Sequence, residues 1–263
     1  MDNRPQALLD RLAAIGQSLK NTGHALALLG LGSVGQETER LDEYSDLDFF
    51  AIVEAGYKSA FIENLDWFSS VCPIAYHFKN TADGYKLLFE DGIFCEMAVF
   101  EPQELANIPF AGGRIIWKDA AFDENLTLPK RKPASENTVE WLLGEALTNL
   151  YVGLGRYHRG EKLSAARFIQ GYAVDRILEL SAVVERPRPG HEDSFALERR
   201  YERRFPATAA YLPQFIQGYE RSRESAQAIL AFLDAHFEVN PAMRTAILEL
   251  CERKGSGPPP STG

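Results

Sequence analysis

The chain has 263 residues, of which 45% are hydrophobic and 25% are charged, as in an ordinary soluble globular protein. Its net charge of −9 argues against a broad basic surface for phosphates, so we expect no stable nucleic-acid binding. There is no apolar run near the roughly 20 residues of a membrane span, no secretory signal pattern, and too few cysteines for a disulfide framework. We therefore expect a cytoplasmic protein that does not bind membranes.

The chain begins with elements that are typical of a layered sheet domain. A helical period of apolar residues over Gln6 to Leu19 predicts an amphipathic helix, and the apolar run from Ala25 to Leu29 predicts a buried strand. The turn that follows contains Gly30, Gly32 and Gly35, which would let main-chain amides approach a ligand. A short helix beginning near Gly32 would add positive potential for a phosphate.

Two aspartates mark the start of the second expected strand, Leu47 to Val53. Asp46 and Asp48 are two residues apart, so on a strand their side chains point to the same face. Adjacent carboxylates repel each other unless a cation or a proton lies between them. Their hard oxygen atoms suit Mg²⁺, which proteins usually bind together with substrate phosphates. A solvated strand end that caps a turn is the alternative interpretation.

A third acidic residue follows in a later strand. The remaining elements expected in this half are a helix over Tyr57 to Ser69, strands over Ile74 to Phe78, Tyr85 to Phe89 and Ile93 to Phe100, and a peripheral strand over Arg114 to Lys118. The sequence Glu90-Asp91-Gly92 predicts a hairpin between the third and fourth of these segments. Glu96 is the one charge in its strand, which is costly unless it is paired or bound. We interpret it as part of the site; an exposed sheet face is the alternative.

The pattern changes after a proline-bounded segment, Pro129 to Pro133. We expect a catalytic domain over residues 1–132, a helical bundle over 133–254 and a disordered tail over 255–263. The expected helices are Val139 to Tyr157 with a capping box of Asn137 and Glu140, then Leu163 to Val184, Phe195 to Phe205, Tyr211 to Phe237, and a last helix from Asn240-Pro241 to about Lys254. The predicted fold class is therefore α+β: a mixed sheet with helices, followed by an all-α bundle.

Gly32-Ser33 followed by Ser45-Asp46-Leu47-Asp48 resembles the signature of the polymerase-beta-type nucleotidyltransferase superfamily. YSDLDFF after GSVG is similar to the matching stretch of antibiotic nucleotidyltransferases, and the two-part layout is similar to that of lincosamide nucleotidyltransferases. This resemblance implies transfer of a nucleoside monophosphate from an NTP, usually ATP, to a hydroxyl of a small acceptor such as a lincosamide-like antibiotic. It also implies Mg²⁺ as cofactor and release of pyrophosphate.

The resemblance also assigns roles to residues. Gly32 and Ser33 would hold the outer phosphates, and Asp46 and Asp48 would be metal ligands. Glu96 would be a further metal ligand, the general base, or both.

Kanamycin-type relatives have a basic residue after the glycine turn, where this chain has Gln36, and Arg40 is the obvious substitute. The helical bundle would form the other wall of an acceptor cleft. The class often dimerises, and a homodimer stays open here.

Two functions of other classes also stay open. One is a protein-modifying nucleotidyltransferase of a toxin–antitoxin system, although such enzymes usually lack a fused bundle. The other is a non-catalytic nucleotide-binding protein, against which the three acidic residues argue.

Overall fold

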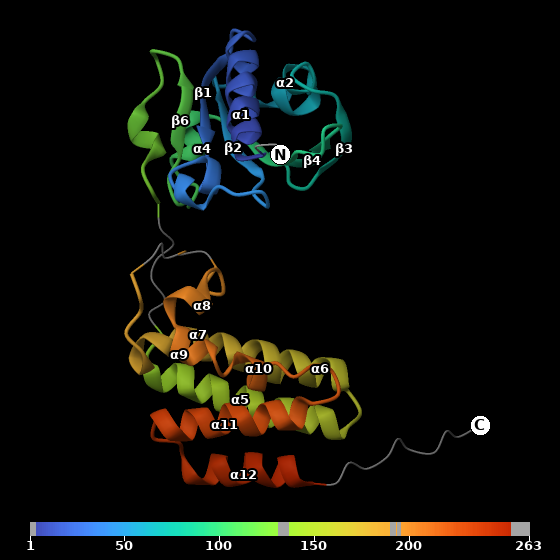
Figure 1. Cartoon of the computed structure of the whole chain (residues 1–263), viewed down its shortest axis with the longest axis vertical. Helices are drawn as coiled ribbons and strands as arrows, with labels where there is room; N and C mark the ends of the chain where they lie inside the picture. Colours follow the sequence, from blue (N-terminus) through green and yellow to red (C-terminus); the bar gives the residue numbers. More distant parts are fainter. Residues whose placement is uncertain (1–3, 131–136, 190–192, 194–195, 254–263) are drawn as a thin grey trace, which may run out of the picture. The chain divides into compact units, whose positions relative to one another are not determined.

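The structure is a computed structural model of the whole chain, and it describes residues 4–130, 137–189, 193 and 196–253. The chain divides into two compact units, Met1–Pro133 and Ala134–Gly263 (Figure 1). The predicted linker core and the predicted disordered tail lie outside the described residues. Within the described residues, no helix combines the length and the apolar character needed to cross a membrane.

The first unit is built on a six-stranded mixed sheet with the order β3-β4-β5-β2-β1-β6. Its strands are β1 (Ala25–Gly30), β2 (Leu47–Val53), β3 (Ile74–Lys79), β4 (Gly84–Phe89), β5 (Phe94–Phe100) and β6 (Arg114–Lys118). Strands β2 and β5 are parallel, whereas the other neighbouring pairs are antiparallel. The expected strands are confirmed to within one residue at each end, and so is the hairpin turn between β4 and β5.

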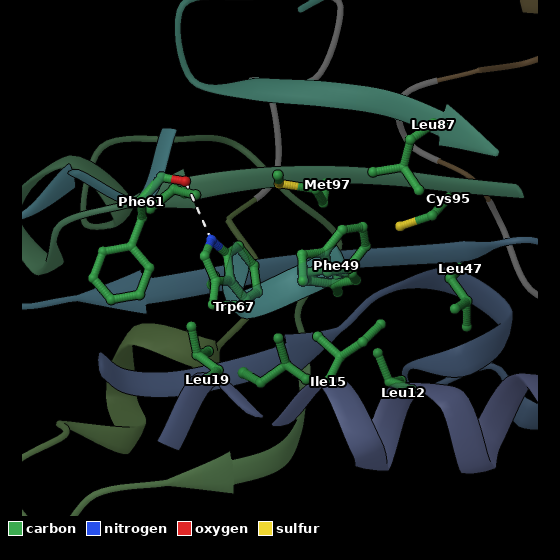
Figure 2. Close-up of a cluster of buried hydrophobic side chains, with 14 of the residues drawn as sticks. Leu12, Ile15, Leu19, Leu47, Phe49, Phe61, Trp67, Leu87, Cys95 and Met97 are labelled. Carbon is green, nitrogen blue, oxygen red and sulfur yellow. Dashed lines mark hydrogen bonds between the residues drawn. The ribbon is translucent and has the colours of Figure 1, made fainter. Parts of the chain in front are cut away.

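One face of this sheet packs against helices. Helix α1 (Arg4–Lys20) and the short helices α2 (Lys58–Glu63) and α3 (Asp66–Ser69) cover it. Figure 2 shows apolar side chains of α1 facing side chains of β2, β4 and β5, and Trp67 Nε1 donating to the Phe61 carbonyl at 3.2 Å. The odd-numbered residues of β2 and β5 fill this core, for example Phe49 and Cys95. Because side chains alternate along a strand, the even-numbered residues point to the opposite face.

The opposite face is covered over β1 and the C-terminal parts of β2 and β5. Helix α4 (Pro102–Leu105) and the one-turn helix η3 (Glu124–Thr127) belong to the segment that closes it. Its buried cluster contains Ala27, Leu29, Ile52, Phe100, Leu105, Phe110 and Phe122. The β3 positions on this face stay exposed: Tyr76 and Phe78 are 57% and 45% exposed.

The single helix expected over Tyr57 to Ser69 is wrong, because the structure has α2 and α3 instead. Between them Asn64 has an extended backbone, with φ −122° and ψ 115°. Its side-chain oxygen accepts a hydrogen bond from the Asp66 amide at 2.7 Å. This local bond offers the backbone an alternative to continuing the helix.

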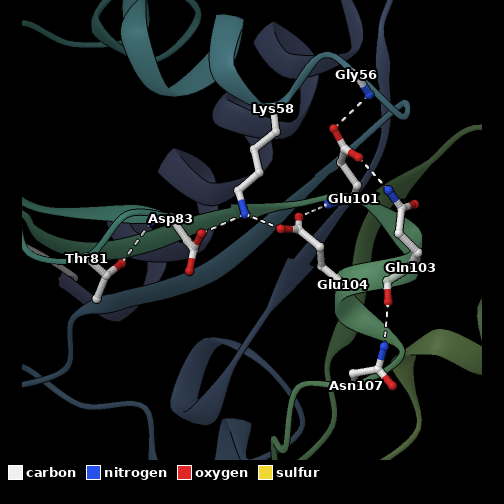
Figure 3. A network of polar contacts seen from close by, with 8 residues as sticks. All are labelled: Gly56, Lys58, Thr81, Asp83, Glu101, Gln103, Glu104 and Asn107. Carbon is white, nitrogen blue, oxygen red and sulfur yellow. Dashed lines mark hydrogen bonds and ion pairs between the residues drawn. The ribbon is translucent and has the colours of Figure 1, made fainter.

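A polar network ties α2, the β3–β4 turn and α4 together (Figure 3). Lys58 Nζ lies 2.6 Å from Asp83 Oδ1 and 2.5 Å from Glu104 Oε1. Glu104 also accepts from the Glu101 amide, and Glu101 accepts from the amide of Gly56. The network thus fixes the end of β5 that is farther from Glu96.

Lys58→Met should lower the free energy of unfolding of this unit by about 1 kcal/mol at pH 7, since its partners are partly exposed. Burial lowers the pKa of Lys58, but hydrogen bonds and charges of Asp83 and Glu104 outweigh it and raise the pKa above 10.5. A raised lysine pKa stabilises fully at neutral pH, and this contribution is lost as pH rises through the raised value. Urea titrations should show the stability difference between Lys58→Met and wild type shrinking above pH 10.5. The control Lys79→Met replaces an exposed lysine and should leave the free energy of unfolding at pH 7 unchanged.

The second unit is helical, as the pattern predicts. Its helices are α5 (Val139–His158), α6 (Lys162–Arg167), the π-helix η4 (Phe168–Tyr172), α7 (Ala173–Val184), α8 (Tyr201–Arg204), α9 (Pro206–Ala209), α10 (Leu212–Phe215), α11 (Ser222–His236) and α12 (Pro241–Glu252). Asn240 caps α12 as expected, accepting from the amides of Ala242 and Met243. The role of residues 133–254 in acceptor binding and the homodimer stay predictions.

Three details of the helical unit differ from expectation. The side-chain cap of α5 is Thr138, which accepts from the Trp141 amide, in place of Asn137. The helix expected over Phe195 to Phe205 is reduced, among the described residues, to the single turn α8. The helix expected over Tyr211 to Phe237 is interrupted between α10 and α11, where Gly218 has a φ of +97° that lies outside helical geometry.

Candidate active site

The structure brings Asp48 and Glu96 together on one face of the sheet. The two residues are direct partners in the parallel pair β2–β5. Partners in register on neighbouring strands point the same way, here to the face opposite α1. Both are partly exposed. Their carboxylates are therefore side by side at the start of the two strands.

Asp46 lies directly before β2 and adds a third charge to the same region. Burial raises the pKa of the Cys95 thiol well above its usual value, and the negative charges of Asp48, Asp46 and Glu96 raise it further. The three carboxylates are therefore near enough to this part of the sheet to act on the same thiol through their charge. Even so, no group of three or more His, Cys, Asp or Glu residues in the described parts of the chain is already arranged to hold a metal ion.

Glu96 is held by two neighbours that sequence reasoning missed. Its Oε2 lies 3.0 Å from Lys86 Nζ, and its Oε1 accepts from Asn80 Nδ2 at 3.4 Å. Lys86 on β4 is the direct cross-strand partner of Glu96. The carboxylate thus stands between Asp48 on one side and an ammonium group on the other.

The glycine turn after β1 reaches the same place. Gly32 begins the one-turn helix η1 (Gly32–Val34) with a φ of +52°, which favours glycine. A Cβ atom at Gly32 would lie 3.8 Å from both Arg40 Nη2 and Asp48 Oδ2. The Leu31 amide donates to the Asp48 carbonyl at 2.8 Å, which fixes the turn against β2. Gly32, Arg40 and Asp48 are therefore neighbours, and half-buried Ser33 follows Gly32 in the turn.

The other two glycines serve the turn itself, which corrects the expectation that all three approach a ligand. A Cβ at Gly30 would lie 2.6 Å from the Val34 carbonyl oxygen, and one at Gly35 would lie 2.5 Å from the Gly30 carbonyl oxygen. The turn closes on its own backbone at both positions. Because η1 has only three residues, the expected helix dipole is also reduced to a single turn.

Arg40 ends the one-turn helix η2 (Thr38–Arg40), and its side chain is 21% exposed. Its Nη2 donates to Glu37, whereas its Nε is buried and has no hydrogen-bond partner among the described residues. A buried guanidinium nitrogen without a partner is costly, and it suits an anion that would complete its hydrogen bonds. Gln36 instead reaches towards the Gly113 carbonyl.

Arg114 is a further residue that the sequence did not indicate. Its Nε and Nη2 donate to the carbonyls of Gly35 and Val34 at 3.0 and 2.8 Å. Arg114 therefore holds the glycine turn in place from β6, the strand that pairs with β1 on the side away from β2.

Gly32→Ala is expected to weaken ATP binding about tenfold, because its methyl group would occupy the space beside Arg40 and Asp48 at a backbone angle that costs about 1–2 kcal/mol. The matched control is Gly23→Ala, which has a φ of +80° and open space around its Cβ position. Both variants should lose similar stability, and only Gly32→Ala should change the Kd for ATP. Equal ATP affinity in the two variants would remove Gly32 from the binding site.

Comparisons with known proteins give similar folds only. No protein-family model and no curated protein sequence matches the chain. Among solved structures it is similar to an aminoglycoside 6-adenyltransferase from Bacillus subtilis, with 14% identity, a TM-score of 0.34, and coverage of 92% of this chain and 91% of that one. A spectinomycin adenyltransferase from Enterococcus faecialis has 13% identity and a TM-score of 0.29, over 93% and 98% of the two chains.

A Thermotoga maritima CCA-adding enzyme has 10% identity and a TM-score of 0.35, over 95% of this chain and 70% of that one. These three structures are thus two adenyltransferases and a CCA-adding enzyme.

Proposed function

We propose that the chain is a metal-dependent nucleotidyltransferase that transfers AMP from ATP to a hydroxyl group of a small acceptor, such as a lincosamide-like antibiotic, and releases pyrophosphate. The observation that supports this most is the in-register placement of Asp48 and Glu96 next to Gly32 and Arg40. A pair of carboxylates beside a glycine turn and an arginine is the combination that phosphoryl chemistry needs.

The residues present suit a magnesium ion. Asp46, Asp48 and Glu96 offer hard oxygen donors, which Mg²⁺ prefers over nitrogen or sulfur ligands. Asp48 and Glu96 lie side by side, and adjacent carboxylates repel each other unless a cation or a proton lies between them. Bound Mg²⁺ would stabilise negative charge on the entering and leaving oxygens.

The chain's own groups have separable tasks. The Gly32 turn, with Ser33, would bind the outer phosphates through its backbone, and Arg40 would neutralise part of their charge. Glu96 would accept the proton of the acceptor hydroxyl while the oxygen of that hydroxyl forms a bond to the α-phosphorus. At the same time the bond from that phosphorus to the bridging oxygen breaks, and pyrophosphate leaves with the electron pair.

The direct test is transfer of label from α-labelled ATP in the presence of Mg²⁺ to clindamycin, to kanamycin or to protein. We expect label on a small hydroxylated acceptor that disappears when EDTA removes the metal. Label on protein alone would support the toxin–antitoxin alternative. Label on no acceptor, together with unchanged ATP affinity in Asp48→Asn, would support a nucleotide sensor.

A further inference from the structure

An exposed aromatic patch borders the candidate site on the same face of the sheet. We call it the aryl face and define it by Tyr76 and Phe78 of β3, Lys86 and Leu88 of β4, and Glu96 of β5. Phe78 pairs with Lys86, and Tyr76 with Leu88, so these side chains share the orientation of Glu96. The rings of Tyr76 and Phe78 lie 6.2 Å apart and both are largely exposed.

The aryl face has little charge of its own. Among the described positions of β3, β4 and β5 on this face, the one carboxylate is Glu96 and the one cation is Lys86. Their ion pair of 3.0 Å balances the two charges on these three strands. The carboxylate of Asp48, which lies beside Glu96 on β2, would be taken up by the metal ion of the proposed reaction. A polycationic acceptor needs several carboxylates to replace its lost hydration, and the described positions of these strands do not offer them.

Lys86 is the charged residue next to Glu96, the proposed base, on the side of β4. Its ammonium group lies next to Glu96, so an acceptor whose hydroxyl approaches Glu96 also approaches Lys86. A positive charge beside that hydroxyl would be repelled, whereas an uncharged ring could stack on Tyr76 or Phe78.

We propose that the aryl face binds the acceptor through an aromatic ring and that Lys86 selects against acceptors with an ammonium group beside the reactive hydroxyl. This inference rests on the proposed transfer reaction and narrows its acceptor to an aromatic alcohol without positive charge. Such an acceptor takes the place of the lincosamide-like antibiotic, which has a basic amine and no aromatic ring.

Two probes with the same ring and the same hydroxyl groups test this inference. Chloramphenicol is an uncharged nitrophenyl alcohol, and its deacylated amine carries an ammonium group at neutral pH. Binding of each is followed by NMR titration of the full chain, which requires no transfer activity. We expect wild type to prefer chloramphenicol, and Lys86→Met to reduce that preference about three- to tenfold, the effect of one partly screened charge at short range. Lys86→Arg keeps the positive charge and should keep the wild-type preference for chloramphenicol over its amine.

The contribution of the two aromatic rings to binding is tested with separate variants. Tyr76→Ala and Phe78→Ala should each weaken both probes about two- to tenfold, the usual value of a ring contact. His77→Ala is the matched control, since His77 is also exposed on β3 but pairs with Leu87 and points to the other face. It should leave both probes unchanged.

Three results would overturn the inference: equal binding of the two probes, a preference that Lys86→Met does not change, or no binding of either probe at millimolar concentration. A charge preference in the binding assay without any transfer of label would instead refute the proposed function and leave the aryl face standing. Transfer to kanamycin that Lys86→Met does not alter would refute the aryl face and leave the function standing.

Discussion

Asp48→Asn is expected to lower kcat for AMP transfer by about a thousandfold while leaving the fold intact. The amide keeps the shape of the side chain but removes the negative charge that faces Glu96 and the glycine turn. A ligand to Mg²⁺ that stabilises the transition state by several kcal/mol corresponds to about three factors of ten in rate. The measurement is the steady-state rate of label transfer, with circular dichroism to check folding.

The control for this prediction is Asp10→Asn on α1. Asp10 is exposed and accepts a hydrogen bond from Gln6, which an asparagine oxygen can also accept. The Asp10→Asn variant should retain the full wild-type rate of AMP transfer. Transfer by Asp48→Asn at more than one tenth of the wild-type rate would show that Asp48 does not bind the metal.

Glu96→Gln is expected to lower kcat by about 10²- to 10⁴-fold, the usual value of a general base. The KM for ATP should change little, because a general base acts on the acceptor hydroxyl, whereas the Gly32 turn and Arg40 would bind the phosphates. The variant removes a proton acceptor and keeps the volume of the side chain. Its measurement is the separation of kcat from KM in the same transfer assay.

Glu90→Gln is the matched control for Glu96, since it stands in the same hairpin and is exposed. Wild-type activity in Glu90→Gln and a large loss in Glu96→Gln would assign the effect to the site. If instead Glu96→Gln raised the KM for ATP and kept kcat, Glu96 would have a role in nucleotide binding alone.

The sheet could be predicted because its strands are short apolar runs separated by turn residues. Leu47–Val53 and Arg114–Lys118 have the bounds that the pattern indicates. The parallel register of β2 with β5 could not be predicted, because it depends on which strands become neighbours in the fold. That register is what places Asp48 opposite Glu96.

Part of the site could have been found from the sequence. The Asp91-Gly92 turn fixes the hairpin register, so counting outwards from it pairs Lys86 with Glu96. Arg114 gave no comparable signal, because its contact with the glycine turn depends on β6 lying next to β1.

The helical predictions failed where local bonds interrupt a periodic pattern. Asn64 and Gly218 stop helices that the apolar period alone would continue, through an Asx hydrogen bond and a positive φ. Periodicity reports which face is apolar, whereas these single residues decide where the chain turns.

In the proposed reaction, Asp46, Asp48 and Glu96 together bind a divalent ion beside Gly32. Crystals grown with Mn²⁺ and a non-hydrolysable ATP analogue would locate the ion through its anomalous scattering. We predict a manganese peak within about 2.5 Å of carboxylate oxygens of Asp46 and Asp48, with Glu96 turned from Lys86 towards it. A nucleotide bound without manganese at these carboxylates, or manganese bound elsewhere in the chain, would contradict the proposed site.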